Sequence, residues 1–278
     1  MSNIAIVTDS TAYLTEEEVK RYGISVVPLT VNFEDGAIED GMIDARAFFA
    51  RVDASTKIPF TSQPAAGQFL EIYRKLLEQG KEIISIHISS KLSGTLESAG
   101  NAARMLDEER ISLVDSWNTA FPLMMLIEAA VQWIEEGLSR AEIVERLEKA
   151  KKEIRTYFIP STLEYLRKGG RIGGAHALLG TLLQIVPLLY LYEGQIEVFE
   201  KVRTRNKAIA RILEELPPDS DHLQVTIGHT LALDEALQVQ EMIAARVPRA
   251  RLRLRDIGPV ISVHTGPGLI GVSMWQRD

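Results

Sequence analysis

The stretch IISIHISSKLSGTLESAG, residues 83–100, decides the fold of the first half of the chain. It reads as a buried strand, then a loop rich in hydroxyl groups, then a helix of small residues. Such a loop leaves unpaired backbone N–H groups at the helix start, where the helix dipole also favours an anion. Ser93 and Thr95 add hydroxyl donors, and Gly94 lets the backbone approach a ligand closely. Because Lys91 is the loop's one cation, we expect either a singly charged anion held by neutral donors or an ordinary strand-to-helix turn.

A second loop of the same kind, TSQP, begins at Thr61. It precedes residues 65–79, in which apolar side chains recur at helical spacing. Ser62 is a suitable N-cap with Pro64 in the first turn, which would leave Thr61 to point elsewhere. Two such units in succession would bring their hydroxyl groups to one point above a parallel sheet. Open α/β sheets bind ligands there, outside the carboxyl ends of the strands.

Composition narrows the class of protein. The chain has 278 residues, 46% of them hydrophobic and 25% charged, as in an ordinary globular protein of one large or two modest domains. A net charge of −7 argues against a general binder of nucleic acid or of membrane surfaces. Disulfides and thiolate chemistry are excluded because the chain has no cysteine. The first residues, MSNIAIVTDS, lack the basic region of a signal peptide, and no apolar stretch is long enough to span a membrane, so we expect a cytoplasmic protein.

The order of predicted elements indicates an α/β protein with two domains. Strands alternate with helices up to about residue 155, which predicts βαβ units and a parallel sheet in a domain of residues 1–156. The remainder, residues 157–278, mixes hairpin signals with helices and predicts an α+β domain with a mixed or antiparallel sheet. The pattern also predicts a strand over 24–33, a helix over 175–185, a strand over 260–263, and a flexible link at GGRIGG, residues 169–174.

Motifs for catalysis are weak. The sequence has no G-x-S-x-G elbow and no P-loop, and no two of its histidines are spaced to bind zinc from one helix. His87 lies within an apolar strand and is expected to be a core residue. Asp9 and Asp115 each follow an apolar strand, so they are candidates for metal ligands or phosphoryl-transfer nucleophiles. The structural interpretation, that both accept hydrogen bonds from nearby loop N–H groups, is preferred.

Two other segments carry candidate contacts. The basic run KVRTRNK, residues 201–207, suits either a docking surface or an exposed helix start. His264 follows the expected strand 260–263 and precedes Gly266-Pro267-Gly268, where it could be a turn residue or a ligand contact. Gly169 to Gly174, with Lys168 and Arg171, could also lie over a ligand.

Taken together, the motifs resemble the DegV family in order and spacing, nearly from end to end. They are IAIVTDST (4–11), TSQPAAGQF (61–69), ISSKLSGTLESA (88–99), VDS (114–116), LEYLRKGGRIGG (163–174) and HTGPG (264–268). The resemblance implies a bacterial, two-domain α/β carrier without catalysis of its own. Such a carrier binds a long-chain fatty acid, such as palmitate or oleate, in an apolar tunnel between the domains. Some family members present the carboxylate to a separate, ATP-dependent fatty acid kinase that makes acyl phosphate.

The same resemblance implies roles for particular residues. It places Thr61, Ser93, Gly94 and His264 at the fatty acid carboxylate. Possible contacts with the head group or the partner kinase are Ser62, Arg171, Arg203 and Arg205. The family form of the second loop ends TSQPS, and Ala65 stands here in place of the last Ser, which removes one hydroxyl and leaves Thr61 intact. Neither a metal nor a cofactor is implied, and no nucleic acid partner or stable membrane insertion is expected.

Apolar residues that could line the tunnel include Phe69, Phe121, residues 123–127, Leu178, Leu179, Leu182 and Leu183, although they could equally fill the two cores. Two alternatives to the carrier stay open at this point. One is a metal-dependent phosphotransferase or hydrolase that uses Asp9 or Asp115. The other is a regulatory interaction protein that works through the basic run.

Overall fold

The computed structural model describes residues 3–179 and 185–277. The chain divides into two compact units. The N-terminal unit comprises residues 1–42 and 61–152, and the C-terminal unit comprises residues 43–60 and 153–278. Residues 43–60 therefore belong to the C-terminal unit. The predicted division into residues 1–156 and 157–278 did not include this excursion of the chain.

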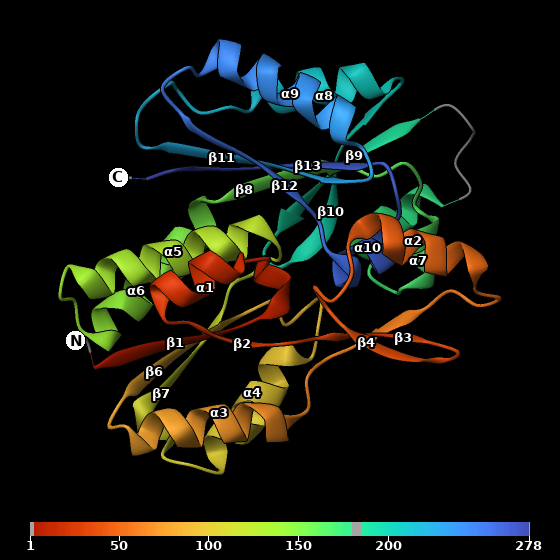
Figure 1. Cartoon of the computed structure of the whole chain (residues 1–278). Coiled ribbons are helices and arrows are strands. Elements are labelled where there is room, and N and C mark those ends of the chain that lie inside the picture. The colour runs from red at the N-terminus through yellow and green to blue at the C-terminus, as the bar shows by residue number, and fades with distance from the viewer. Residues whose placement is uncertain (1–2, 180–184, 278) are drawn as a thin grey trace. The chain divides into compact units, whose positions relative to one another are not determined.

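A four-stranded parallel sheet forms the centre of the N-terminal unit, as predicted (Figure 1). In spatial order its strands are β2 (Ser25–Val27), β1 (Ile4–Asp9), β6 (Glu82–His87) and β7 (Ile111–Asp115). Val7 pairs with Ser85 of β6, and His87 pairs with Asp115 of β7. Because the strands are parallel, Asp9, His87 and Asp115 all lie at the carboxyl edge of the sheet.

Helices cover both faces of this sheet (Figure 1). One face packs against α3 (Ala66–Glu78) and α4 (Thr95–Arg104), where Phe69 and Tyr73 are fully buried against Val7 and Ile83. On the other face lie α1 (Glu16–Tyr22), α5 (Phe121–Glu135) and α6 (Arg140–Glu153). Residues 123–127 of α5 are almost completely buried, so they contribute to the core whatever else they contact.

The expected strand over residues 24–33 is instead two strands. It breaks at Pro28, which has no N–H to donate to a sheet. The second piece, β3 (Thr30–Phe33), forms a hairpin with β4 (Gly36–Glu39) and joins β5 (Phe60–Ser62) in a separate three-stranded sheet of order β4-β3-β5. This break carries the chain from the parallel sheet to the sheet that holds Thr61.

The C-terminal unit contains a six-stranded mixed sheet, which confirms the predicted α+β character. Its spatial order is β10 (Gln195–Val202), β9 (Val186–Tyr192), β8 (Arg155–Ile159), β13 (Leu269–Gln276), β11 (Leu223–Thr230) and β12 (Arg251–Asp256). Among the described strands of this sheet, β11 and β12 are the one pair that runs in parallel. The apolar faces of α8 (Arg205–Glu214) and α9 (Leu233–Arg246) pack on this sheet and form the main core of the unit.

Two predictions for this half were wrong or incomplete. Residues 260–263 are not a strand but part of α10 (Pro259–Thr265), whose first residue is a proline, a favoured start for a helix. The expected helix 175–185 is a 3₁₀ helix at Gly173–Leu178, and Pro187 lies within β9. Residues 180–184, which include Leu182 and Leu183, lie outside the described residues. The remaining helices are α2 (Ala45–Ala54), α7 (Glu164–Lys168) and 3₁₀ helices at Ser10–Ala12 and Glu108–Arg110.

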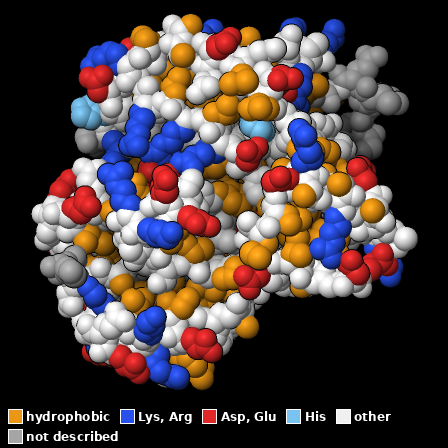
Figure 2. All heavy atoms as spheres, viewed as in Figure 1, with side chains coloured by type: hydrophobic (Ala, Val, Ile, Leu, Met, Phe, Trp, Pro, Cys, Tyr) orange, Lys and Arg blue, Asp and Glu red, His pale blue; other side chains and the backbone are white. Residues whose placement is uncertain are grey.

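Within the described ranges, no helix is both long and apolar enough to cross a membrane. The cytoplasmic location stays a prediction. Side chains of both charge signs and scattered hydrophobic groups cover the face drawn in Figure 2, where several Lys and Arg side chains gather despite the negative net charge.

Candidate functional site

The two hydroxyl-rich loops of the N-terminal unit meet at Gly94. The side chain of Gln63, from the loop after β5, lies so close that a Cβ built on Gly94 would be 2.1 Å from Gln63 Oε1. Gln63 Nε2 donates to Ser98 Oγ in the first turns of α4 at 3.0 Å. The sequence predicted that two successive strand–helix units would bring these loops together above the parallel sheet. The loops do make contact, but Thr61 lies on β5 of the separate three-stranded sheet, so this part of the prediction was wrong.

Ser93 occupies the last turn before α4. Its Oγ lies 2.9 Å from Thr95 Oγ1 and also accepts from the backbone N–H of Thr95 at 3.3 Å. The N-cap position belongs to Gly94, which offers no side chain to the helix start. Ser93 and Gly94 are partly exposed, whereas Thr95 is buried. The hydroxyl of Ser93 therefore combines a fixed position with access to a ligand.

Thr61 and Ser62 lie at the end of β5 rather than at a helix start. The Oγ of Ser62 accepts from Asn32 Nδ2 at 2.8 Å, so Ser62 is not the N-cap that was predicted. Helix α3 starts four residues later, and the backbone N–H of Ala65 donates to Gln68 Oε1 at 2.9 Å. Since successive strand residues face opposite sides, Thr61 points away from the Ser62 contact with Asn32.

Asp9 is fully buried and both of its oxygens are used. Oδ1 accepts from the N–H and the hydroxyl of Thr11 at 3.1 and 2.6 Å. Oδ2 accepts from the N–H of Ile88 at 2.9 Å and lies 3.0 Å from His87 Nδ1. This confirms the structural interpretation of Asp9. A carboxylate enclosed by four donors is not available as a nucleophile, which counts against the phosphotransferase or hydrolase alternative.

A chain of buried polar groups continues from Asp9. His87 Nε2 lies 2.6 Å from Ser85 Oγ, which lies 2.7 Å from the hydroxyl of Tyr73. The order Asp-His-Ser is that of a hydrolytic triad. However, these three side chains and that of Tyr73 all have 0% exposure, so no substrate can reach Ser85. Burial raises the pKa of Tyr73, so its hydroxyl stays protonated. The sequence did hold a signal for this chain: Ser85 and His87, two residues apart on an apolar strand, share one face.

Asp115, at the end of β7, occupies the position equivalent to Asp9 on the other side of β6. Its carboxylate accepts from the hydroxyl and the N–H of Ser90 at 2.5 and 3.3 Å, and from the N–H of Trp117 at 3.1 Å. The turn that follows is strained, because Trp117 and Ala120 have φ values of 55° and 54°. Asn118 from this turn accepts the N–H of Ser89 at 2.8 Å. The preferred interpretation of Asp115 is confirmed as well.

In the C-terminal unit, His264 lies in the last turn of α10 and not after a strand. A Cβ on Gly169 would be 2.1 Å from His264 Nδ1, so this glycine permits close packing of α7 against α10. The guanidinium of Arg171 donates to Gly169 O at 2.7 Å. Burial, aided by the positive charge of Arg171, lowers the pKa of His264 to about 4, so the imidazole is neutral at pH 7.

The glycine-rich segment 169–174 is therefore a packing element rather than a flexible link. A side chain on Gly173 would collide with the backbone of Ile196 in β10, its Cβ lying 2.2 Å from Ile196 O. Gly173 also has φ +52°, a conformation that glycine adopts without steric cost.

Arg203 and Arg205 differ in their surroundings. Arg205 forms an ion pair with Glu235 of α9 at 2.6 Å and donates to Gly268 O at 2.6 Å and Ile159 O at 3.4 Å. Arg203 is exposed just before the N-cap Thr204 of α8. Arg205 thus joins four segments of its own unit, while Arg203 faces solvent.

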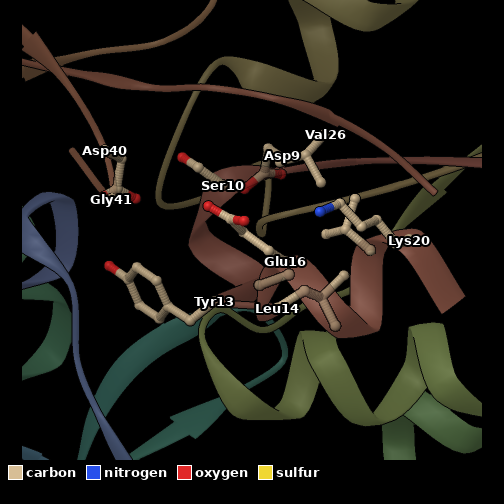
Figure 3. Close-up of a pocket in the computed structure, with 11 residues that line it drawn as sticks. Asp9, Ser10, Tyr13, Leu14, Glu16, Lys20, Val26, Asp40 and Gly41 are labelled. Atoms are coloured by element: carbon tan, nitrogen blue, oxygen red, sulfur yellow. The ribbon is translucent and has the colours of Figure 1, made fainter. Parts of the chain in front are cut away.

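A hollow of about 320 Å³ lies beside the end of β1 in the N-terminal unit (Figure 3). Glu16 and Lys20 extend from α1 along one side of it, and Asp40 and Gly41 lie on the opposite side. None of the predicted head-group residues lines it. Among the described residues, no group of three or more His, Asp or Glu side chains is arranged to hold a metal ion.

Comparison with known proteins covers the whole chain. The model of the family described as "Uncharacterised protein, DegV family COG1307" matches residues 3–277. A DegV domain-containing protein of Streptomyces coelicolor is 41% identical over 280 residues, which cover 99% of each chain. A DegV family protein from Thermus thermophilus, whose solved structure concerns fatty acid binding, superposes with a TM-score of 0.92 at 34% identity. DegV of Bacillus subtilis, described as a fatty acid binding protein, superposes with a TM-score of 0.89 at 33% identity. Both structural matches cover 100% of each chain. The chain therefore belongs to the DegV family.

Proposed function

We propose that this protein binds a long-chain fatty acid and holds its carboxylate with Thr61, Ser93 and the backbone at Gly94. The observation that carries the proposal is the junction of the two hydroxyl loops, where Gln63 lies on Gly94 beside the partly exposed Ser93. The similarity to the fatty-acid-binding proteins of Thermus thermophilus and Bacillus subtilis supports the proposal, because each of these two structural matches covers the entire chain.

Electrostatics favour a singly charged head group at this junction. The donors near Gly94 are hydroxyls and amides, and the start of α4 adds backbone N–H groups and the positive end of a helix dipole. Neutral donors orient a carboxylate without the strong ion pair that an arginine would form. We include His264 in the proposed head-group set. Being neutral at pH 7, it would donate one N–H without adding charge.

The tail supplies most of the proposed affinity. Burial of each methylene contributes about 0.8 kcal/mol, so roughly 14 of them contribute on the order of 11 kcal/mol before the costs of association. A palmitoyl or oleoyl chain fits this requirement. The tunnel between the domains stays a prediction from the resemblance, as does a share in its lining for Phe69, Phe121 and the first turns of α5.

We further propose that the protein is a carrier and that a separate kinase phosphorylates the bound fatty acid. A head group held by neutral donors remains available for transfer of a phosphoryl group. The burial of Asp9 behind four donors supports a carrier over an enzyme that uses this carboxylate. Arg203, exposed at the start of α8, is the proposed contact for the kinase.

Binding of an acid and of the matching alcohol tests the head-group assignment. Delipidated protein is titrated with oleate and with oleyl alcohol, as wild type and as the double variant Thr61→Ala/Ser93→Ala. We expect the variant to bind oleate at least about tenfold more weakly, since two hydrogen bonds to a charged group are lost, and oleyl alcohol unchanged.

The matched control is Thr15→Ala/Ser139→Ala, which removes two hydroxyls that cap α1 and α6 by accepting backbone N–H groups in the first turns of those helices. It should bind both ligands as the wild type does. A double variant at Thr61 and Ser93 that retains full affinity for oleate would contradict the assignment.

Formation of acyl phosphate tests the carrier proposal. Loaded protein incubated with ATP and Mg²⁺ should form none by itself, and should form it when a bacterial fatty acid kinase is added. Acyl phosphate produced by the isolated protein, and lost in Asp9→Asn, would show that the enzyme alternative is right.

A further inference from the structure

Two aspartates occupy equivalent positions on either side of the loop that carries Ser93. Strand β6 lies between β1 and β7 in the parallel sheet. Each flanking strand ends in an aspartate, Asp9 in β1 and Asp115 in β7. Both carboxylates turn toward the loop of residues 88–94 that leaves β6, and each accepts a backbone N–H from it.

Asp9 holds the first residue of this loop from the buried side. Its Oδ2 accepts the N–H of Ile88 at 2.9 Å, and the neighbouring His87 lies 3.0 Å away. Thr11 fixes the other oxygen through two bonds, so the carboxylate has one orientation. The fully buried chain through Ser85 to Tyr73 holds His87 in turn.

Asp115 holds the same loop from the partly exposed side. It accepts both the N–H and the hydroxyl of Ser90, at 3.3 and 2.5 Å. The third bond of the carboxylate, from the N–H of Trp117, ties it to its own turn. Lys151 donates to the backbone carbonyl of Asp115 at 3.0 Å and fixes the end of β7 further.

The geometry of Ser93 is built on the residue between these two anchors. The carbonyl of Ser89 accepts the N–H of Leu92 and the N–H of Ser93, both at 3.0 Å. Ser89 lies between Ile88 and Ser90, the two residues that the aspartates hold. A shift of either anchor would therefore move Ser89 O, and with it the backbone of Ser93 and Gly94.

We propose that Asp9 and Asp115 act together as positioning residues that preorganise the loop for the head group of the fatty acid. This inference rests on the proposed function. Donors fixed before the ligand arrives lose little conformational freedom on binding, so preorganisation raises affinity. In this proposal, the sequence places an aspartate after each of the two apolar strands that flank β6 because both sides of the central loop are then fixed.

Selectivity between oleate and oleyl alcohol tests the inference. Asp115→Ala is the primary variant, because Asp115 is partly exposed and its removal is more easily tolerated than that of the buried Asp9. We expect its affinity for oleate to fall about tenfold and its affinity for oleyl alcohol to stay within about twofold, since the alcohol depends on the tail. Asp9→Asn, where it folds, should change selectivity in the same direction.

Two further variants separate positioning from loss of stability. Ser139→Ala removes the hydroxyl cap of α6, next to Arg140, which pairs with Glu82 at the amino end of β6. It should lower stability without changing selectivity. In the Ser93→Ala background, Asp115→Ala should have much less further effect on oleate binding, because an interaction that acts through Ser93 is already lost.

The outcomes distinguish this inference from the proposed function. If Ser93→Ala weakens oleate binding and Asp115→Ala does not, the inference is wrong and the proposed function stands. A loss of affinity for acid and alcohol alike in Asp115→Ala would also overturn it. A wild-type protein that binds neither ligand would overturn both.

Discussion

Gln63 rests on Gly94, and this contact is what joins the two hydroxyl loops of the N-terminal unit. A Cβ on Gly94 would lie 2.1 Å from Gln63 Oε1 and 2.7 Å from Gln63 Nε2, so a side chain at position 94 would have to displace Gln63. Gln63 Nε2 also donates to Ser98 Oγ at 3.0 Å. Gly94 and the side-chain amide of Gln63 thus contribute to the position of Thr61 relative to Ser93.

Replacement of Gly94 by alanine should weaken oleate binding more than it weakens the fold. The new methyl group forces Gln63 away and breaks its bond with Ser98, which costs about 1 kcal/mol of unfolding free energy. The two loops then lose their contact, and we expect affinity for oleate to fall about tenfold. Urea denaturation and oleate titration measure the two effects separately.

Gly67→Ala is the matched control for this substitution. Gly67 lies in the first turn of α3 and has no heavy atom within 4 Å of a Cβ built on it. Alanine there should leave binding unchanged and raise stability by up to about 1 kcal/mol, because it lowers the conformational entropy of the unfolded chain. Equal affinities of the two variants would show that the Gln63 contact does not organise the site.

Alanine substitution of Arg205 should lower the stability of the protein, whereas alanine substitution of Arg203 should affect the kinase reaction. Arg205→Ala removes an ion pair with Glu235 and two bonds to backbone carbonyls, so it should destabilise the protein by about 1 to 3 kcal/mol. Arg203→Ala removes an exposed side chain and should leave the unfolding free energy within about 0.5 kcal/mol of wild type. Instead it should raise the apparent KM of the kinase for loaded protein. A strong loss of stability in Arg203→Ala, or no change in KM, would refute its assignment to the kinase contact.

In the buried hydrogen-bonded series from Tyr73 to Asp9, substitution of the central residue Ser85 should lower the unfolding free energy more than substitution of the terminal residue Tyr73. Ser85→Ala leaves both Tyr73 and His87 with an unsatisfied buried group, so it should lower the unfolding free energy by about 2 to 4 kcal/mol. Tyr73→Phe removes only the terminal hydroxyl, and Ser85 keeps its contact with His87. We expect a loss of about 1 kcal/mol for that variant. Chemical denaturation would contradict this account if Tyr73→Phe proved the more costly of the two.

His264 should make stability depend on pH below neutrality. Its pKa in the folded protein is about 4, below the ordinary value of 6.5, so the unfolded chain takes up the proton more readily. The stability that neutral His264 contributes is therefore fully present above pH 6.5 and is lost as pH falls toward 4. The loss amounts to at most about 3.5 kcal/mol, and partial exposure of the side chain reduces it.

His264→Gln isolates this contribution from that of other titrating groups. The difference in unfolding free energy between wild type and variant should decrease as the pH is lowered from 7 to 4. A difference that stays constant over this range would mean that His264 is protonated as easily in the fold as in the unfolded chain.

The two loops meet, although not as two units above one parallel sheet, because Thr61 lies on β5 of the separate three-stranded sheet. The parallel sheet itself was predictable because it depends on local pattern. Short apolar strands followed by hydroxyl-rich turns specify where β1, β6 and β7 end, and parallel strands must end at one edge. The capping box from Thr15 to Glu18 and the helix stop at Gly23 were also predictable, since each is a contact between neighbours in the chain.

What the sequence did not reveal depends on contacts between distant residues. Ser62 looked like an N-cap, but Asn32, thirty residues earlier, binds its hydroxyl. The GGRIGG segment looked flexible, yet Gly169 and Gly173 are required by His264 and Ile196. In two places a proline marked the correct boundary, but the apolar residues around it led to the prediction of a strand. Pro28 marks the break between β2 and β3, and Pro259 marks the start of α10.

The central claim is that the protein carries a long-chain fatty acid. The most direct measurement is extraction of the purified protein with organic solvent, followed by mass spectrometry and then reloading of the delipidated protein with palmitate or oleate. The account predicts close to one fatty acid per chain after purification, and uptake of one equivalent on reloading. Protein that is reproducibly free of lipid and takes up neither acid would contradict it.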